Sequence, residues 1–387
     1  MSNGVRHMQK FLLGVNYWPA KKGMFWWKEF EREEVQRDFE RISSVGLEIV
    51  RLFLLWEDFE PSANKINQEA VANLIEVFRI AREEGLKILL TLFVGHMSGA
   101  NWVPPWLVNR NIYQDEGILN ASSFLAETVA DSVKEENALF GYDLANEIDN
   151  FVRPVNRQEA RKWLRFIVSR IKAVDSIHPV TLGLHLKNVE EDRGFWPEDL
   201  AESCDFLSMH SYSIYAKWAD NPLDGKVAAF TNRLITRMSG AKVMHTEFGL
   251  CTTMVQSREI NTILDGIRGR CYLANEREAE SYFDTSLRGL YESGALGAML
   301  WCYSDYNSAI FNQPPFDKAV HERSFGLFRA DGNPKPYKDI IKKYQGLEVK
   351  QIPVVKEIDN PVYYQEPLKQ LKEEYRKFRE KEASLQI

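Results

Sequence analysis

Cysteine is scarce in this chain, and the few cysteines have no paired spacing. The 387 residues include 4 cysteines, and none of them forms a Cys-x-x-Cys motif. Zinc ribbons and thioredoxin-like redox sites rely on such spacing, and a chain of this length buries enough apolar surface to need no disulfide staples. We therefore expect structural thiols rather than metal ligands or redox groups, and no cofactor; the cysteines are Cys204, Cys251, Cys271 and Cys302.

Long apolar runs and an excess of basic residues are also missing. Stretches such as Phe11–Val15 and Ile88–Val94 are far shorter than the roughly 18 residues of a membrane helix. The 49 basic residues are outnumbered by 55 acidic ones, for a net charge of −6, so no cationic field collects phosphates. We expect neither nucleic acid nor a membrane as a partner. Met1–Lys10 lacks the apolar core of a signal peptide, which favours a cytoplasmic protein.

The residues that are present indicate a globular α/β protein. Hydrophobic residues make up 44% of the chain and aromatic residues 12%, too much for a disordered chain. Short apolar runs alternate with longer amphipathic segments, a pattern typical of βαβ units around a parallel sheet. Expected strands are Phe11–Tyr17, Glu48–Leu55, Leu86–Val94, Leu139–Ala145, Pro179–His185, Asp205–His210, Lys242–Glu247 and Gly297–Tyr303. Expected helices between them include Glu33–Val45, Gln68–Gly85, Ala121–Glu136, Arg157–Asp175 and Glu276–Ser293.

Eight strands of this kind predict a (β/α)8 TIM barrel, a fold that holds 250 residues or more in one domain. We expect residues 1–345 to form the catalytic barrel and residues 346–387 to form a small C-terminal extension packed on it. The extension offers a possible strand over Ile352–Ile358 and a charged helix over Glu366–Lys381. Apolar residues of that helix recur at helical spacing, which favours packing on the barrel over binding of a partner protein.

Polar and aromatic residues gather at the carboxyl ends of the expected strands. In chain order they are Asn16, Tyr17, Trp18, Trp56, Glu57, His96, Asn146, Glu147, His210, Tyr212, Glu247, Trp301 and Asp305. This face carries the active site in barrels of this type, whatever the reaction.

Two glutamates at this face point to a reaction. Glu147 ends the fourth strand in Asp-Leu-Ala-Asn-Glu, and Glu247 ends the seventh in Thr-Glu-Phe-Gly, so both carboxylates face the barrel mouth from opposite sides. Glycoside hydrolysis uses such a pair, one as the acid for the leaving oxygen and the other as nucleophile or base. Either glutamate alone would be read as a rim salt bridge, but the pair favours catalysis.

These motifs resemble glycoside hydrolase family 5, within the clan of retaining (β/α)8 glycosidases. Asn146-Glu147 and Thr246-Glu247-Phe248-Gly249 carry the resemblance, together with strand-end residues in the right order: Arg51, His96, His210, Tyr212 and Trp301. The segment from Phe325-Gly326-Leu327-Phe328 to Pro336 is also similar to the ending common in this clan. The resemblance runs from about Phe11 to Tyr344.

The resemblance implies a role for each of these residues. Glu147 would be the acid/base and hold a proton near neutral pH, and Glu247 would be the nucleophile, kept ionised by Arg51 and the Tyr212 hydroxyl. Asn146 would bind the sugar 2-hydroxyl. His96 and His210 would bind sugar hydroxyls or orient the glutamates.

Tryptophans near the strand ends offer stacking surfaces for sugar rings. Trp301 is the expected platform under the cleaved sugar, while Trp18 and Trp56 fit substrate binding and ordinary loop packing about equally well. His245 shares a face with Glu247 one layer deeper, and we expect it in the core.

The substrate is expected to be an oligosaccharide, and the sequence leaves its identity and the oligomeric state open. The opening Gly14–Pro19 and the tryptophan-rich rim resemble intracellular β-mannosidase-like members of family 5. Long segments follow strands six and seven, and we expect part of each to be helix. The remainder of these segments, with Tyr215, Trp218 and Tyr272, is expected to rise over the site and close it into a pocket. A pocket favours exo attack on short β-manno-oligosaccharides. Endo-β-1,4-mannanase and β-glucanase share the catalytic set and stay as alternatives.

Two other functions are weaker fits. A metal-dependent barrel hydrolase usually begins with His-x-His on its first strand, whereas this chain has Gly14-Val15-Asn16-Tyr17, so no metal is expected. A carbohydrate-binding barrel that has lost catalysis is disfavoured because both glutamates and their supporting residues are present.

Overall fold

A barrel of parallel strands forms the centre of the molecule. The computed structural model describes residues 9–107, 109–264 and 266–384. Its main sheet has the order β7-β6-β3-β2-β1-β14-β10-β9-β8. The strands are β1 Leu12–Asn16, β2 Ile49–Phe53, β3 Lys87–Val94, β6 Leu139–Asn146, β7 Val180–Thr181, β8 Gly183–Leu184, β9 Leu207–His210, β10 Val243–Phe248 and β14 Gly297–Leu300.

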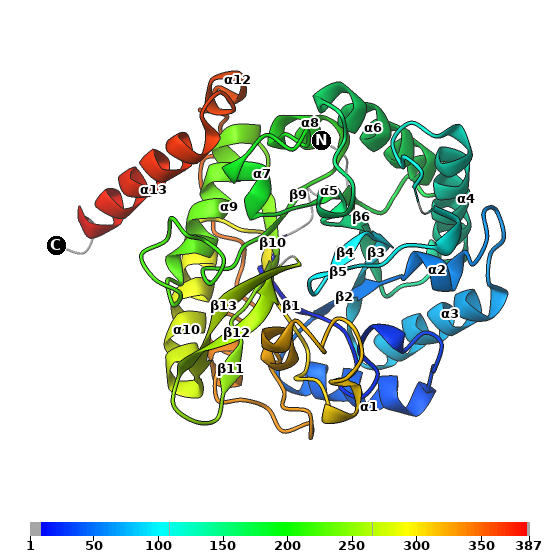
Figure 1. Cartoon of the computed structure of the whole chain (residues 1–387), viewed down its shortest axis with the longest axis horizontal. Coiled ribbons are helices and arrows are strands. Elements are labelled where there is room, and N and C mark those ends of the chain that lie inside the picture. The colour runs from blue at the N-terminus through cyan, green and yellow to red at the C-terminus, as the bar shows by residue number, and fades with distance from the viewer. Residues whose placement is uncertain (1–8, 108, 265, 385–387) are drawn as a thin grey trace.

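The ends of this sheet, β7 and β8, belong to one short segment of chain. β7 pairs with β6 on one side, and β8 pairs with β9 on the other, with Leu182 between them. Residues 180–184 therefore act as the fifth of eight strands and complete the circle seen in Figure 1. All eight expected strands are confirmed within a few residues, and so is the (β/α)8 fold.

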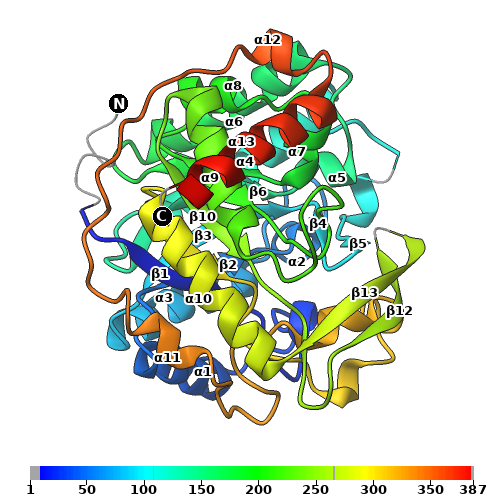
Figure 2. The same ribbon diagram turned by 90° about the vertical axis from the view of Figure 1, so that its left-hand side faces the viewer.

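Helices cover the outside of the barrel between the strands (Figures 1 and 2). Four of the long ones begin at an Asn or Asp whose side chain accepts hydrogen bonds from the first turn, at Asn67, Asp115, Asn156 and Asn275, so their starts are fixed locally. The main helices are α1 Arg32–Ser44, α3 Gln68–Glu83, α4 Glu116–Val133, α6 Arg157–Val174, α8 Pro197–Ser203, α9 Lys226–Ser239 and α10 Glu276–Glu292, and a single turn, α11 Lys338–Ile341, follows later in the chain. Shorter ones are α2 Trp56–Phe59, α5 Ile148–Phe151, α7 Leu186–Glu190 and α12 Asn360–Tyr363.

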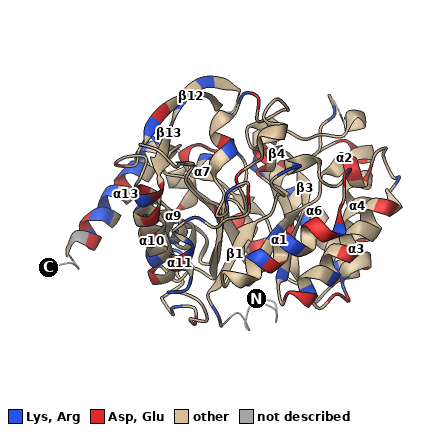
Figure 3. Ribbon diagram, turned by 90° about the horizontal axis from the view of Figure 1, so that it is seen from below, with Lys and Arg blue, Asp and Glu red and all other residues tan. Residues whose placement is uncertain are grey.

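The inside of the barrel is a packed core. Ile49, Leu89, Met244 and Met299, from four different strands, form one buried cluster with Phe206, Leu296 and Val349. Such a layer fills the barrel below its mouth, as expected for this fold. Many charged side chains lie on the outer helices, where Figure 3 shows both signs interspersed, as along α1 and α13. No helix in the described part of the chain combines the length and apolar character needed to cross a membrane.

The segment after β10 differs from the expectation. It contains no helix; it forms β11 Thr252–Thr253 and an antiparallel hairpin of β12 Arg258–Leu264 and β13 Ile267–Asn275. Alternating β-branched residues such as Ile260 and Thr262 suit a strand better than a helix. The segment after β9 does contain the expected helix, α9. A smaller hairpin, β4 His96–Met97 with β5 Ala100–Asn101, follows β3.

The C-terminal extension runs along the outside of the barrel. The strand expected over Ile352–Ile358 is wrong: these residues are irregular. Glu357 and Ile358 donate their backbone N–H groups to the carbonyl of Arg237 at the end of α9, and a closed barrel leaves no free edge for a further strand. The expected helix is present as α13 Pro367–Ser384, and its Leu371 and Tyr375 are buried.

Candidate active site

Glu147 and Glu247 occupy the carboxyl ends of the fourth and seventh strands. Glu247 lies within β10 and is 4% exposed. Glu147 directly follows β6, with φ 46° and ψ 47°, a left-handed backbone conformation that is uncommon for residues other than glycine and clusters at functional sites. This turn ends β6 and starts α5.

The two carboxylates come close together over the barrel mouth, with His210 between them. One oxygen of Glu147, one oxygen of Glu247 and a ring nitrogen of His210 all lie within 4.8 Å of one another. His210 Nδ1 is 3.1 Å from Glu147 Oε1 and 3.6 Å from Glu247 Oε1. The structure thus brings together the two glutamates and the histidine singled out from the sequence.

Arg51, on β2, holds the inner side of Glu247. Its Nη1 donates to Glu247 Oε1 and, over 3.1 Å, to Asn16 Oδ1. Its Nε and Nη2 both donate to Asp143 Oδ2, over 2.9 and 2.6 Å. The guanidinium is fully buried, so its charge acts on Glu247 with little screening by water.

Tyr212 holds the other oxygen of Glu247. Its hydroxyl donates to Glu247 Oε2 over 2.7 Å. Burial, together with the surrounding charges of Glu247, Glu147 and Glu322, raises the pKa of this hydroxyl well above its usual range. Tyr212 therefore stays a proton donor, and both oxygens of Glu247 accept hydrogen bonds, one from Arg51 and one from Tyr212.

His210 is a neutral group at this site. Burial lowers the pKa of its imidazole to about 3, with the charge of Arg51 acting in the same direction and that of Glu247 against it. Its Nε2 has no hydrogen-bond partner among the described residues, whereas Nδ1 faces Glu147, so we assign the proton to Nδ1. Gly183, on β8, makes room for the ring: a Cβ there would lie 2.8 Å from Nε2.

A chain of polar groups supports Glu147 from the outer side. Asn150 Nδ2 donates to Glu147 Oε2 over 2.7 Å, and Arg193 Nη1 donates to Asn150 Oδ1 over 2.5 Å and to Asp149 Oδ2 over 3.1 Å. His185 and Asn188 also contact Asp149 Oδ2. None of these supporting residues is evident as such in the sequence, because they meet only through the loops after β6 and β8.

Asn146 and His96 occupy the same rim. Asn146 Oδ1 accepts from Arg51 Nη2 over 2.9 Å, and its Nδ2 donates to the carbonyl oxygen of His96 over 2.6 Å. The His96 ring turns to Asn101, with Nδ1 2.8 Å from Oδ1. His96 therefore positions Asn146 through its backbone, and its side chain belongs to the β4–β5 hairpin.

The expected aromatic residues differ in their surroundings. Trp301 packs edge-on against Phe53, whose ring also lies under the Arg51 guanidinium at 4.7 Å. Trp18 stacks on the same Phe53 with ring centroids 5.0 Å apart, and its Nε1 has no hydrogen-bond partner among the described residues. Trp56 is buried against Phe93 and donates to Glu60 over 2.7 Å, an arrangement typical of structural packing.

Only one of the three residues expected to rise over the site fits that expectation. Tyr215 lies 5.5 Å from Tyr212 between ring centroids. Trp218 turns away instead and packs on Phe230 and on Tyr375 of α13, because that side of α9 presents an apolar surface. Tyr272 donates to Glu278 at the start of α10.

Glu147, His210 and Glu247 are also spaced like potential metal ligands, but their neighbours do not suit a cation. Arg51 places its positive charge on one oxygen of Glu247, and Tyr212 donates to the other. A divalent metal would have to displace both donors. The donors around Glu247 therefore do not suit a divalent metal at this site.

Comparisons with known proteins agree with this architecture. No family model and no curated protein matches the chain. Among solved structures, an exo-β-1,4-mannosidase from Opitutaceae bacterium strain TAV5 superposes with a TM-score of 0.74 at 24% identity, over 87% of this chain and 60% of that one. This chain thus matches less than two thirds of the length of that enzyme.

Two GH5_18 structures superpose equally well, each with a TM-score of 0.75. One, from Streptomyces cattleya in complex with GlcNAc, is 20% identical over 87% of this chain and 80% of that one. The other, a variant from Bifidobacterium longum in complex with Manβ1-4GlcNAc, is 21% identical over 88% of this chain and 80% of that one. The fold is that of these (β/α)8 glycosidases.

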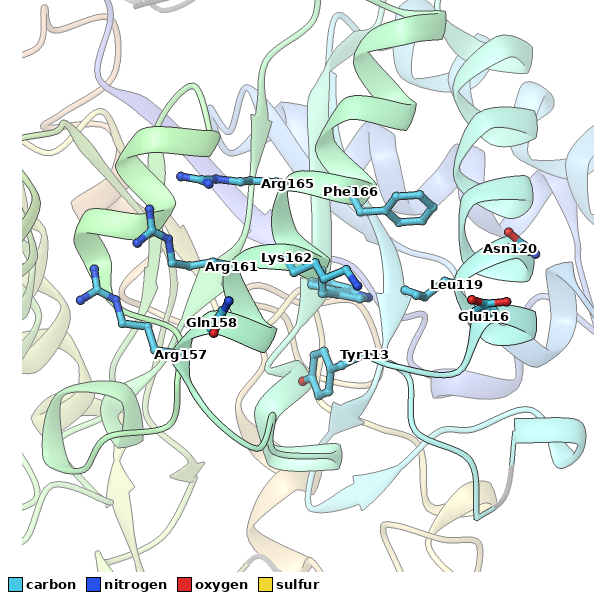
Figure 4. Close-up of a pocket in the computed structure, with 11 residues that line it drawn as sticks. Tyr113, Glu116, Leu119, Asn120, Arg157, Gln158, Arg161, Lys162, Arg165 and Phe166 are labelled. Carbon is cyan, nitrogen blue, oxygen red and sulfur yellow. The ribbon is translucent and has the colours of Figure 1, made fainter.

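Two further features lie outside the site. Cys251 and Cys271, 20 residues apart in the sequence, have their sulfur atoms 3.6 Å apart, and all four cysteines are free thiols. A cavity of about 1180 Å³ lies between α4 and α6, where Lys162 and Phe166 face Leu119 (Figure 4). Its arginines turn to acidic residues of α8, as in the pair of Arg161 with Asp199. The cavity lacks the paired carboxylates of the barrel mouth.

Proposed function

We propose that this chain is a retaining glycoside hydrolase of family 5 that cleaves β-linked mannosides with Glu147 and Glu247. The proposal rests chiefly on the oxygens of these residues, which lie within 4.8 Å of each other beside His210. Retaining glycosidases hold their carboxyl groups roughly 5–5.5 Å apart, whereas inverting ones leave about 6.5–9.5 Å for a water molecule.

The surroundings of the glutamates fit a double displacement. Glu247, ionised between Arg51 and Tyr212, attacks the anomeric carbon while Glu147 protonates the leaving oxygen. Glu147 then accepts a proton from the water that hydrolyses the glycosyl-enzyme. Asn150 and His210 hold the two oxygens of Glu147 in place for both steps.

Support for a mannoside substrate comes from the solved structures, which include an exo-β-1,4-mannosidase and a complex with Manβ1-4GlcNAc. We propose exo attack on short β-manno-oligosaccharides in the cytoplasm. Endo-β-1,4-mannanase and β-glucanase activities are the alternatives, since both use the same glutamates.

A first experiment tests Glu247 as the nucleophile. Glu247→Ala should abolish turnover of an aryl β-mannoside, and azide should restore it with a product of inverted configuration. Glu159→Gln is the control, because Glu159 is a buried glutamate on α6 whose carboxylate accepts a hydrogen bond from the backbone of Val155. A wild-type product of inverted configuration, seen by NMR at early times, would refute a retaining mechanism.

A second experiment tests Glu147 as the acid/base. Acid catalysis matters most for poor leaving groups, so Glu147→Ala should cripple hydrolysis of β-mannobiose while largely sparing the first step with an activated phenol. Equal losses on both substrates would mean that Glu147 is structural.

The substrate itself is tested by products and by a substrate panel. Sequential release of mannose from mannohexaose supports exo attack; early di- and trisaccharides without mannose would favour the endo-mannanase alternative. Aryl glycosides that differ only in the glycone separate mannosidase from glucosidase activity. If none of them is turned over, a carbohydrate-binding barrel without catalysis becomes the favoured hypothesis.

A further inference from the structure

Glu322 is a buried carboxylate without a cationic partner of its own. It lies on the 3-10 helix Val320–Ser324 that follows β14, and it is 7% exposed. Among the described residues, no Lys or Arg forms an ion pair with it; only the imidazole of His321 approaches, with Nε2 3.3 Å from Oε1. A buried carboxylate is costly unless hydrogen bonds satisfy it, so its neighbours are informative.

Two neutral donors from the active-site rim reach Glu322. The Tyr215 hydroxyl donates to Oε1 over 3.2 Å, and Trp301 Nε1 donates to Oε2 over 3.4 Å. A carboxylate has about four acceptor positions, and the contact to Oε2 is long. Oε2 therefore keeps the capacity to accept a hydrogen bond from a ligand hydroxyl.

The carboxylate also lies on the catalytic side of the rim. Its indole partner, Trp301, is the expected platform for the cleaved sugar, and its charge is near enough to contribute to the raised pKa of Tyr212, the partner of the nucleophile. Phe325, three residues along, contacts the Tyr212 ring edge-on at 6.0 Å. Glu322 thus lies near Tyr212, which hydrogen-bonds Glu247.

Three loops meet at Glu322 and fix its position. His321 Nε2 is 2.8 Å from the Tyr215 hydroxyl, and its Nδ1 is 2.9 Å from Thr262 Oγ1 on β12. The β12–β13 hairpin adds a backbone bond from Ile263 to Lys318, and Figure 2 shows the hairpin beside the segment that follows β14. The loops after β9, β10 and β14 therefore form one continuous wall beside Trp301.

From this geometry we infer that Glu322 is a specificity-determining residue: its carboxylate accepts a hydrogen bond from a hydroxyl at C4 or C6 of the non-reducing terminal sugar stacked on Trp301. This inference rests on the proposed function. A terminal sugar bound in this way abuts the wall, so a longer chain cannot continue past it. Glu322 then selects an unsubstituted terminal glycone, which explains exo attack.

The test compares 4-nitrophenyl β-mannoside with its 4-deoxy and 6-deoxy analogues. Hydrogen bonds to charged groups are strong, so we expect the wild type to lose about 10- to 100-fold in kcat/KM on the analogue that lacks the contacted hydroxyl. Glu322→Ala should lose about as much on the parent substrate. Because the contact is already gone, Glu322→Ala should cleave parent and analogue within about threefold of each other.

Two further variants separate a sugar contact from a bracing role. Glu322→Gln keeps the side-chain shape and an acceptor oxygen, and should retain part of the discrimination between parent and analogue. Tyr215→Phe loosens the wall but leaves the carboxylate in place, so we expect a loss below about fivefold with full discrimination.

The outcomes are distinguishable. A wild type that cleaves neither this mannoside nor the other aryl glycosides would refute the proposed function, and this inference with it. Turnover by the wild type with undiminished activity of Glu322→Ala would overturn this inference alone. This inference would also be overturned if Glu322→Ala discriminated between parent and deoxy analogue as strongly as the wild type does. The same holds if Tyr215→Phe lost activity and discrimination to the same extent as Glu322→Ala.

Discussion

Replacing Gly183 with alanine should disturb catalysis through His210. A Cβ at Gly183 would lie 2.8 Å from His210 Nε2 and 2.9 Å from Cε1, against an ordinary contact of 3.4 Å or more. The ring must therefore move by 3.4 − 2.8, or 0.6 Å, on the Nε2 side. Its opposite nitrogen is 3.1 Å from Glu147 Oε1, so the movement reaches the proposed acid/base directly.

The expected loss follows from the size of this movement. Misplacement of a catalytic group by about 1 Å costs on the order of 10²-fold, so a displacement of 0.6 Å should lower kcat/KM about 10- to 100-fold. This loss equals about 1.4–2.7 kcal/mol of transition-state stabilisation. The assay is kcat/KM for the aryl β-mannoside, with thermal unfolding of the same samples.

Gly289→Ala is the matched control. Its Cβ would lie 2.7 Å from the Cβ of Ala229, between α10 and α9 and outside the barrel, so it should lower Tm and leave kcat unchanged. Gly183→Ala with wild-type kcat/KM would refute the reasoning. So would an equal loss from Gly183→Ala in a His210→Ala background, because the effect would then not pass through the imidazole.

Three further predictions concern buried charges. Burial lowers the pKa of His245 to about 3 from 6.5, so below pH 6.5 the unfolded chain binds a proton that the folded chain does not, and the fold loses stability as the pH falls. In urea unfolding, the wild type should lose about 2 kcal/mol more than His245→Gln between pH 7.5 and pH 5. Arg51→Met leaves Asp143 and Glu247 without their cation and should cost about 3–5 kcal/mol in urea unfolding; recovery on adding Asp143→Asn checks the cause, and no loss would contradict it. Tyr212→Phe should lower kcat/KM about 10- to 100-fold with little change in Tm, because a hydrogen bond to charged Glu247 is lost; unchanged kinetics would count against that role.

The barrel and its two glutamates were predictable because both depend on periodic patterns. Buried strands recur eight times, polar or aromatic residues gather at the ends of seven of them, and the register of each strand carries its last residues to the same face. The hairpin after β10 was missed although Asp265-Gly266, a common turn pair between strands, stands in the sequence. The length of that segment favours a helix, whereas its alternation favours strands.

The supporting residues could not be predicted in the same way. Asp143 had a usable signal, since a charged residue inside a buried strand needs a partner, and that partner is Arg51. Asn150, Arg193 and Glu322 had none, because irregular loops place them. Their roles depend on contacts between segments up to 107 residues apart, as between Tyr215 and Glu322.

The left-handed backbone at Glu147 matters for anyone who wants to trap an intact oligosaccharide in the crystal. Every side chain with a Cβ is strained at φ 46°, least so asparagine and most so a β-branched residue. Inactive variants at this position therefore differ in stability as well as in chemistry. Asparagine combines loss of the proposed acid with a relaxed turn, and it is the replacement best suited to long soaks and slow crystal growth.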